Sequence, residues 1–188
     1  MSPHLLAIEE VTLDRGGRRL FEGMDLALDA GEAVLVTGPN GVGKSSLLRL
    51  AAGLLEPAAG RVHRAPAALV DEHPALDERL TLGRALAFWA RLDGGDPAEG
   101  MAAMAIDHLA EVPVRMLSTG QRKRAALARL IASDRPLWLL DEPANGLDAD
   151  GLDCLAGIIT AARAAGRAML VASHQPIGLG DHRTIKLT

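Results

Sequence analysis

Short apolar runs alternate with stretches of helical periodicity along most of this chain. Runs of four or five apolar residues are typical of strands buried on both faces of a sheet. They occur at 33–36, 67–70, 137–140 and 168–172. Apolar residues at helical spacing occur at 46–52, 82–89, 121–132 and 151–165. This alternation predicts an α/β fold with a mainly parallel core sheet covered by helices on both faces.

The N-terminal segment has a different pattern. Residues 5–13 and 24–29 alternate partially between apolar and polar positions, and the turn Arg15-Gly16-Gly17-Arg18 lies between them. This combination predicts antiparallel strands. A further short strand is expected at 60–62, so the chain should begin with an antiparallel β subdomain.

The segment 76–110 predicts a helical insertion. Thr81 is a good N-cap for a helix over 82–89, and the Gly- and Pro-containing residues 93–97 are expected to interrupt the helical segment with a turn. A second helix is expected to carry Met101, Met104, Ile106, His108 and Leu109. We therefore expect a helical subdomain at about 74–120 within a single domain spanning 1–188.

Composition excludes several classes of protein. A net charge of −4 gives no reason to expect nucleic-acid binding. The single cysteine, Cys154, cannot form an internal disulfide and is expected to be a small buried apolar residue. No apolar run approaches the roughly 18 residues of a membrane helix. Residues 1–4 show no basic segment leading into an apolar core, so no signal peptide is expected. A cytoplasmic protein that reaches a membrane only through partners fits these features.

The most specific motif is Gly38-Pro39-Asn40-Gly41-Val42-Gly43-Lys44-Ser45, which fits the phosphate-binding pattern G-x-x-x-x-G-K-[ST]. Its backbone N–H groups and the start of the following helix, at Ser46, favour an anion. Lys44 offers a charge to the β- and γ-phosphates, and the Ser45 hydroxyl offers a ligand to Mg²⁺. Alone, the motif indicates only that a nucleoside triphosphate binds.

A pair of carboxylates, Asp141 and Glu142, ends the apolar run at 137–140. Ligands of α/β sheets bind at the carboxyl ends of strands. Asp141 is therefore a candidate to hold Mg²⁺ through water, and Glu142 a candidate general base for the attacking water. The alternative is a solvated pair at the end of a strand, which the phosphate loop disfavours.

A second candidate phosphate site begins the helix over 121–132. Ser118 lies at its N-cap position, and Gly120 allows the backbone to approach an anion. One nucleotide in one chain does not need two such sites. We interpret Ser118, Gly120 and Gln121 as meeting nucleotide held by another copy, the alternative being an ordinary capped helix.

Taken together, the chain resembles the ATPase subunit of ABC transporters over essentially its whole length. Five motifs occur in the family's order: the phosphate loop 38–45, the signature 117–121, the carboxylate strand 137–142, the D-loop 146–148 and the switch histidine His174. The resemblance implies a head-to-tail homodimer with two ATP molecules between the subunits. It places His174 at the γ-phosphate and Asp148 at the dimer interface.

Three positions depart from the family pattern. Thr119 stands in the signature where glycine is usual. Arg15 stands near the place of the adenine-stacking aromatic residue, and a guanidinium can stack on a base. His73 aligns with a glutamine that contacts Mg²⁺, and its imidazole would titrate near neutral pH.

Weaker signals resemble one subfamily, the ATPases of the haem exporter in bacterial cytochrome c maturation. These signals are the segments 72–76, 79–82 and 173–176, together with the short chain. The resemblance implies separate transmembrane permease subunits, a place on the cytoplasmic face of the inner membrane, and haem export. No residue here identifiably contacts haem. The alternatives are the ATPase of another small ABC transporter, or a soluble ABC ATPase that acts on DNA or ribosomes. The short insertion and the single ATPase unit argue against the soluble class, and the signature argues against an unrelated kinase.

Overall fold

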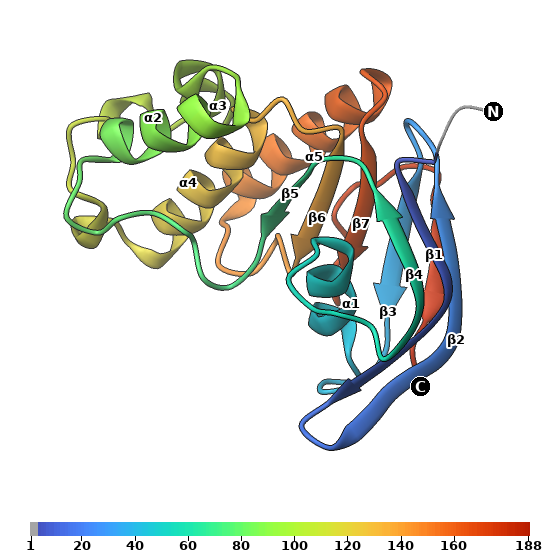
Figure 1. Cartoon of the computed structure of the whole chain (residues 1–188). Coiled ribbons are helices and arrows are strands. Elements are labelled where there is room, and N and C mark those ends of the chain that lie inside the picture. The colour runs from blue at the N-terminus through green and yellow to red at the C-terminus, as the bar shows by residue number, and fades with distance from the viewer. Residues whose placement is uncertain (1–3) are drawn as a thin grey trace.

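The computed structural model describes residues 4–188 and consists of two sheets with helices around them (Figure 1). Residues 1–3, part of the segment inspected for a signal peptide, lie outside the described residues. The core sheet has the order β5-β6-β7-β3-β8, and each neighbouring pair is parallel. Its strands are β3 (Ala33–Thr37), β5 (Ala67–Val70), β6 (Leu137–Asp141), β7 (Ala168–Ala172) and β8 (Arg183–Lys186). The predicted α/β fold with a parallel core sheet is confirmed.

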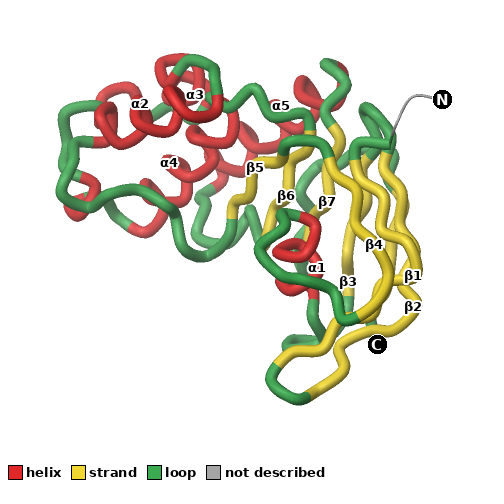
Figure 2. The backbone as a smooth tube through the Cα atoms, viewed as in Figure 1, coloured by secondary structure: helices red, strands yellow, loops and turns green. Residues whose placement is uncertain are grey.

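The antiparallel sheet has the order β2-β1-β4 and contains β1 (Leu6–Arg15), β2 (Arg18–Leu28) and β4 (Ala59–Arg64). The predicted turn joins the first two strands through Gly16 and Gly17, both at positive φ. Figure 2 shows the strands of this sheet as long yellow tubes beside those of the core sheet. Its hairpin tip comes near α1 (Lys44–Ala51), the helix that follows the phosphate loop.

The remaining helices are α2 (Leu82–Asp93), α3 (Pro97–Ala103), α4 (Thr119–Ile131) and α5 (Ala149–Ala164), with short 3₁₀ turns η1 (Asp107–Leu109) and η2 (Val114–Met116). Alternate residues of β6 belong to different apolar clusters. Leu137 and Leu139 pack in the cluster that contains α1, whereas Trp138 and Leu140 pack in the cluster that contains α4. The core sheet is therefore buried on both faces, which explains its uninterrupted apolar strands.

The second helix of the insertion is shorter than predicted. It ends at Ala103, and Ala105 takes the left-handed conformation at φ 54°. The N–H of Ile106 donates to the Met101 carbonyl, and the N–H of Ala105 to the Ala102 carbonyl. These two bonds form a Schellman cap, with alanine at the position that glycine usually takes. The prediction that one helix carries Met104, Ile106 and His108 was therefore wrong.

Two further expectations differ from the structure. Thr81 lies at the N-cap of α2, but no capping bond from its side chain is present within the described part of the chain. The free N–H groups of Leu82 and Gly83 instead donate to the carbonyls of Val112 and Ala110. Strand β8 was not predicted, because only Ile185 in it is apolar and partly buried. Within residues 4–188, no helix is both long and apolar enough to cross a membrane.

Candidate nucleotide site

The phosphate loop connects the carboxyl end of β3 to the first residue of α1. Gly38, Gly41 and Gly43 have φ angles of 139°, 79° and 117°, a region that favours glycine. A Cβ on Gly38 would lie 2.5 Å from the Leu187 carbonyl oxygen. The loop is thus held closely against the residue that follows β8, and it ends at the N-terminus of α1, where the first N–H groups of the helix have no partner within the helix.

Lys44 is the first residue of α1 and is buried, with 8% of its surface exposed. Its Nζ donates to the carbonyl oxygens of Gly38 at 2.9 Å and Pro39 at 3.1 Å. These contacts fold the ammonium group back over the loop that it follows. Phosphate oxygens are stronger partners for an ammonium group than neutral carbonyls. The side chain is therefore already placed where a bound phosphate would meet it.

A cavity of about 650 Å³ opens around this loop. Ten of the residues predicted from the sequence line this cavity. They are Asn40, Gly41, Gly43, Lys44, Ser45 and Ser46 of the phosphate-loop segment, together with Arg15, Asp141, Glu142 and His174. These residues come from the β1–β2 hairpin, the loop before α1, the first turn of α1, and the ends of β6 and β7. The cavity is also lined by Arg18, Leu20, Glu72 and Asn145, which the motifs did not indicate.

Asp141 and Glu142 occupy different environments at the end of β6. Asp141 is the last strand residue and is 5% exposed. Glu142 has a positive φ of 45°, and its N–H donates to the Ala172 carbonyl of the neighbouring strand. Residues other than glycine rarely adopt this φ, and those that do occur often at functional sites. The bend turns the Glu142 carboxylate out of the sheet and into the cavity.

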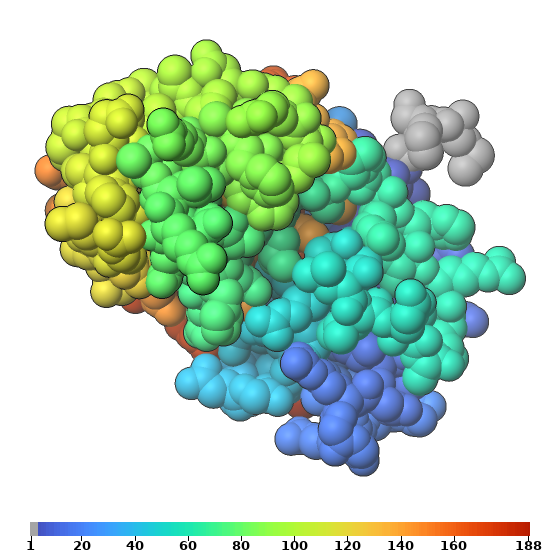
Figure 3. Space-filling model, turned by 60° about the vertical axis from the view of Figure 1, so that its left-hand side comes forward, coloured from blue at the N-terminus to red at the C-terminus, as the bar shows by residue number. Residues whose placement is uncertain are grey.

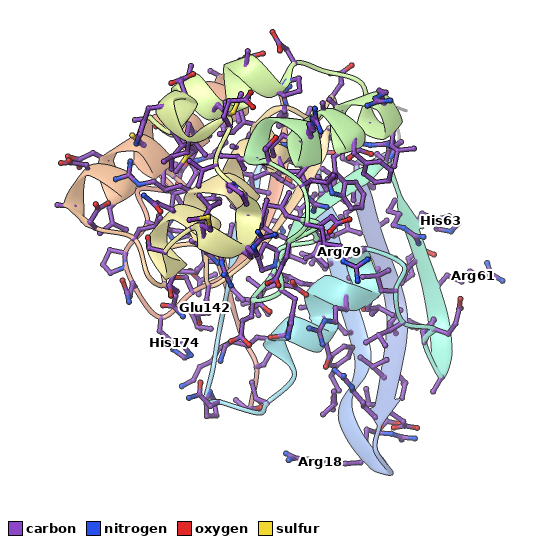
Figure 4. All side chains as sticks on the ribbon, turned by 90° about the vertical axis from the view of Figure 1, so that its left-hand side faces the viewer. Arg18, Arg61, His63, Arg79, Glu142 and His174 are labelled. Atoms are coloured by element: carbon purple, nitrogen blue, oxygen red, sulfur yellow. The ribbon has the colours of Figure 1, made fainter. Side chains whose placement is uncertain are left out.

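His174 holds the Glu142 carboxylate and the phosphate loop together. Its backbone N–H donates to Glu142 Oε2 at 3.3 Å, and its Nε2 lies 3.6 Å from Glu142 Oε1. The same Nε2 lies 3.1 Å from Asn40 Oδ1. Figure 4 shows Glu142 and His174 close together on one side of the molecule. The imidazole therefore lies between the candidate base and the loop that would hold the γ-phosphate.

Lys123 of α4 lies beneath these carboxylates. Burial lowers the pKa of its ammonium group, although the charges of Asp141, Asp71, Glu142 and Glu72 oppose that shift. Its Nζ reaches the Asp141 carbonyl oxygen at 3.5 Å. Lys123 of the helix that follows the signature thus lies within the field of four carboxylates at this edge of the sheet.

The oxygen atoms around the cavity fit Mg²⁺ chemistry. Mg²⁺ takes oxygen ligands, keeps several waters, and usually binds through one or two carboxylates together with substrate phosphates. The Ser45 hydroxyl and the Asp141 carboxylate supply such oxygens, and both residues line the cavity. Among residues 4–188, no group of three or more His, Cys, Asp or Glu residues is gathered tightly enough to hold a metal by itself. This donor set is therefore suited to Mg²⁺ that arrives with a nucleotide.

Arg15 lies at the edge of the cavity but is already bonded. Its Nη1 donates to the Ser46 hydroxyl oxygen at 3.0 Å, which joins the hairpin to α1. The neighbouring Arg18 and Leu20 line the same edge. Figure 4 shows Arg18 at the tip of the hairpin. Stacking of Arg15 on a base remains a prediction.

The signature lies in a separate hollow of about 280 Å³, lined by Ser118, Gly120, Gln121, Asp148 and six other residues. Ser118 and Gln121 form a capping box, with bonds of 3.2 Å and 2.9 Å between each backbone N–H and the other side chain. In the described chain, residues 4–188, no residue lines both this hollow and the cavity of the phosphate loop. Within one copy, the phosphate loop and the signature therefore line two separate hollows.

The D-loop is packed against the signature helix. A Cβ on Gly120 would lie 2.9 Å from the Gly146 carbonyl oxygen, so the backbones approach closely. Arg124 of α4 forms an ion pair with the exposed Asp148, which also caps α5 by accepting from the Gly151 N–H. The hydrogen bond from Arg124 and then that from Gly151 lower the pKa of Asp148. Asp148 is therefore ionised at neutral pH and fixed to the signature helix.

His73 is not among the residues that line the cavity of the phosphate loop in the described chain. It lines an adjoining cavity of about 450 Å³ together with Glu72, Lys123, Glu142 and other residues. Its backbone N–H donates to Asp71 Oδ1 at 2.9 Å. Glu72, one residue earlier, lines both cavities. The alignment with the family's glutamine therefore does not predict which side chain faces the nucleotide.

The parallel sheet, the antiparallel sheet and a phosphate loop facing two carboxylates define the class of ATP-binding cassettes. Residues 21–145 match the model of the family described as ABC transporter. A solved structure described as the ATP binding subunit of an ABC transporter superposes with a TM-score of 0.83 at 25% identity, and the match covers 90% of this chain and 79% of that one. A dimeric ATP-binding cassette in a post-hydrolysis state, at 22% identity, shares the fold with a TM-score of 0.85 over 97% of this chain and 94% of that one.

Curated relatives indicate which subfamily of ABC transporters the chain belongs to. The "Cytochrome c biogenesis ATP-binding export protein CcmA" of Sphingopyxis alaskensis is 55% identical over 94% of this chain and 93% of its own length. The protein of the same name from Zymomonas mobilis subsp. mobilis is 52% identical over 97% of this chain and 84% of its own length. The chain belongs to the ABC transporter family and, within it, to the cytochrome c biogenesis ATP-binding export proteins. The prediction of an ABC-type ATPase is confirmed by this membership.

Proposed function

We propose that two copies of this chain associate head to tail and enclose two ATP molecules, each between the phosphate loop of one copy and the signature of the other. The observation that carries this proposal is the separation of the two hollows. The phosphate loop and Ser118 lie at the ends of different elements and line different surfaces. A two-fold symmetric pairing, in which the loop of each copy meets the signature of the other, would bring them together twice.

Hydrolysis in such a site depends mainly on positioning and charge. Lys44 and the loop N–H groups would hold the β- and γ-phosphates, and the partner's signature helix would present its N-terminus to the γ-phosphate. Glu142 would accept a proton from the attacking water, with His174 keeping its carboxylate beside Asn40. Mg²⁺ held by Ser45 and Asp141 would neutralise charge on the phosphates. Because the site is complete only on closure, hydrolysis would be coupled to opening and closing of the dimer.

The helical insertion supplies the surface that we assign to separate membrane subunits. Phe88 and Leu92 lie four residues apart on α2 and are 51% and 59% exposed. Beside them lies an apolar hollow of about 220 Å³ lined by Leu80, Ala85, Trp89 and other residues. The space-filling view in Figure 3 brings this insertion forward as the green surface. Exposed apolar side chains next to a hollow are typical of a protein contact.

Introducing charge into this surface should detach the membrane subunits. We expect Leu92→Glu to reduce co-purification of the ATPase with its membrane partners at least about tenfold, because a buried unpaired carboxylate costs several kcal/mol. ATP binding should be unchanged, since Leu92 is remote in the fold from the phosphate loop. Leu54→Glu is the matched control, since Leu54 is 64% exposed and lies outside the insertion. Equal recovery of both variants with the membrane fraction would contradict the assignment.

The cargo is proposed from the relatives, whose names describe cytochrome c biogenesis and export. We assign haem delivery for cytochrome c maturation to the complex, at the cytoplasmic face of the bacterial inner membrane. The test is complementation of a bacterium whose own gene for the cytochrome c biogenesis ATP-binding export protein has been deleted. Wild-type protein should restore haem-stained c-type cytochromes, whereas Lys44→Ala should not. Restoration by the Lys44→Ala variant would refute an ATP-dependent role.

A further inference from the structure

One peptide unit joins the two carboxylate residues at the end of β6, and both of its polar groups are bonded. The Glu142 N–H donates to the Ala172 carbonyl of β7 at 2.8 Å. The Asp141 carbonyl oxygen of the same peptide accepts from Lys123 Nζ at 3.5 Å. Because a trans peptide directs its N–H and C=O to opposite sides, β7 holds this unit from one side and α4 from the other.

The Asp141 carbonyl is directed away from β7, toward the side of β5, because β6 lies between these two strands. Within residues 4–188, β5 ends at Val70 opposite Leu140, so it has no residue to pair with Asp141. A carbonyl group on a residue as buried as Asp141 requires a hydrogen-bond partner. Lys123 of α4 supplies that partner where the strand ends.

The orientation of this peptide determines where the Glu142 side chain lies. Glu142 has a φ of 45°, and a residue other than glycine keeps such a conformation only when the surrounding contacts maintain it. The angle φ describes rotation of Glu142 relative to the peptide that precedes it. The Ala172 carbonyl and the Lys123 ammonium group, which hold that peptide, therefore also hold the bend that turns the Glu142 carboxylate into the cavity.

The acidic surroundings of Lys123 keep its ammonium group at the end of β6. Glu142 lines both the cavity of the phosphate loop and the adjoining one, whereas of these two cavities of the described chain Lys123 lines only the adjoining one. Burial lowers the pKa of Lys123, and the charges of Asp141, Asp71, Glu142 and Glu72 oppose that shift. Attraction by these carboxylates therefore adds to the single bond with the Asp141 carbonyl.

We propose that Lys123 is a positioning residue for ATP hydrolysis: it holds the peptide that precedes Glu142 and so keeps the Glu142 carboxylate in place for the attacking water. This proposal rests on the proposed function, since it concerns the base of that reaction. Lys123 is not among the residues that line the cavity of the phosphate loop in the described chain. Its loss should therefore slow the chemical step and leave nucleotide binding nearly unchanged.

Replacement of Lys123 by methionine tests this role. Methionine removes the charge and the donor but keeps an unbranched side chain with a high helix propensity. We expect kcat for ATP to fall about 10- to 100-fold, because a misplacement of about 1 Å can cost about 10²-fold. KM for ATP and the affinity for a fluorescent ADP analogue should stay within about twofold of the wild type. Lys123→Arg, which keeps the charge and a donor, should restore most of the turnover.

Arg122→Met is the matched control. Arg122 is the neighbouring residue of α4, lines the same adjoining cavity and carries the same charge. Its side chain donates to the Arg115 carbonyl and pairs with Glu78, so it holds a different part of the chain. This variant should keep turnover close to that of the wild type. A fall in kcat equal to that of Lys123→Met would assign the effect to lost charge on α4 and would overturn the proposal.

A double variant separates the positioning of Glu142 from a general structural role. A protein that carries Glu142→Gln has no base to position, so adding Lys123→Met should not lower its residual turnover further. An additional loss as large as that in the wild-type background would contradict the proposal, and so would a wild-type kcat for Lys123→Met. Lys123→Gln replaces the methionine variant if the latter does not bind ADP and is therefore misfolded. Wild-type turnover of Glu142→Gln alone would instead refute the assigned base, and the inference with it.

Discussion

Replacing Glu142 by glutamine is expected to lower ATP turnover by about 10²- to 10⁴-fold, the contribution of a well-placed general base. Glutamine keeps the size of the side chain and an acceptor oxygen near the His174 N–H, so ATP binding should persist. With hydrolysis blocked, the closed dimer should accumulate. Phosphate release at saturating ATP measures the first effect, and light scattering after addition of ATP measures the second.

Glu78→Gln is the matched control for charge, because Glu78 lines the adjoining cavity and pairs with Arg122 at 3.6 Å on the surface. It should retain turnover close to that of the wild type, because exposed ion pairs contribute little to stability. Turnover of the Glu142→Gln variant at the wild-type rate would remove Glu142 from the chemistry. The bend at Glu142 would then need another explanation.

Replacing Lys44 by alanine should weaken ATP binding by about 10- to 100-fold, which corresponds to the loss of hydrogen bonds from a charged donor to phosphate. The variant also loses the bonds from Nζ to the Gly38 and Pro39 carbonyls, so the loop is less ordered before ATP binds. Lys44→Met, which fills the buried space without charge, separates the two effects. Fluorescent-nucleotide titration of both variants gives the affinities, and wild-type affinity in either one would contradict the role of Lys44.

The buried strands were predictable because the core sheet is covered on both faces. Leu137 to Leu140 have to be apolar in such a sheet, and the sequence pattern follows directly. Strand β8 lies at the edge of the sheet and buries little, so it leaves almost no apolar pattern. The end of α3 was missed for a different reason. Its Schellman cap uses Ala105 in place of the glycine that marks such an end in a sequence.

The residues of the candidate site that belong to recognisable sequence motifs could be predicted, and the others could not. Asp141, Glu142 and His174 meet Asn40, Gly41 and the residues 43–46 in one cavity because strands β3, β6 and β7 end side by side. Arg18, Glu72 and Asn145 were missed because they reach the cavity from the start of β2 and from two loops, and the meeting of these segments depends on tertiary packing. For Asn145 the only sequence signal is its position between Glu142 and the D-loop. For Glu72 the alignment pointed one residue further, to His73.

Two inactive variants provide the most direct test of the claim that each ATP site is shared between two copies. Lys44→Ala damages the phosphate loop, and Ser118→Arg blocks the signature with a large side chain at the helix N-cap. Each variant alone should be almost inactive, because every site in its dimer contains one damaged part. A mixed dimer has one intact site, formed by the loop of the Ser118→Arg copy and the signature of the Lys44→Ala copy. ATPase activity of an equimolar mixture should therefore recover to about a quarter of the wild-type value, given random pairing. A mixture that stays inactive, although labelled subunits demonstrably exchange, would contradict the shared site.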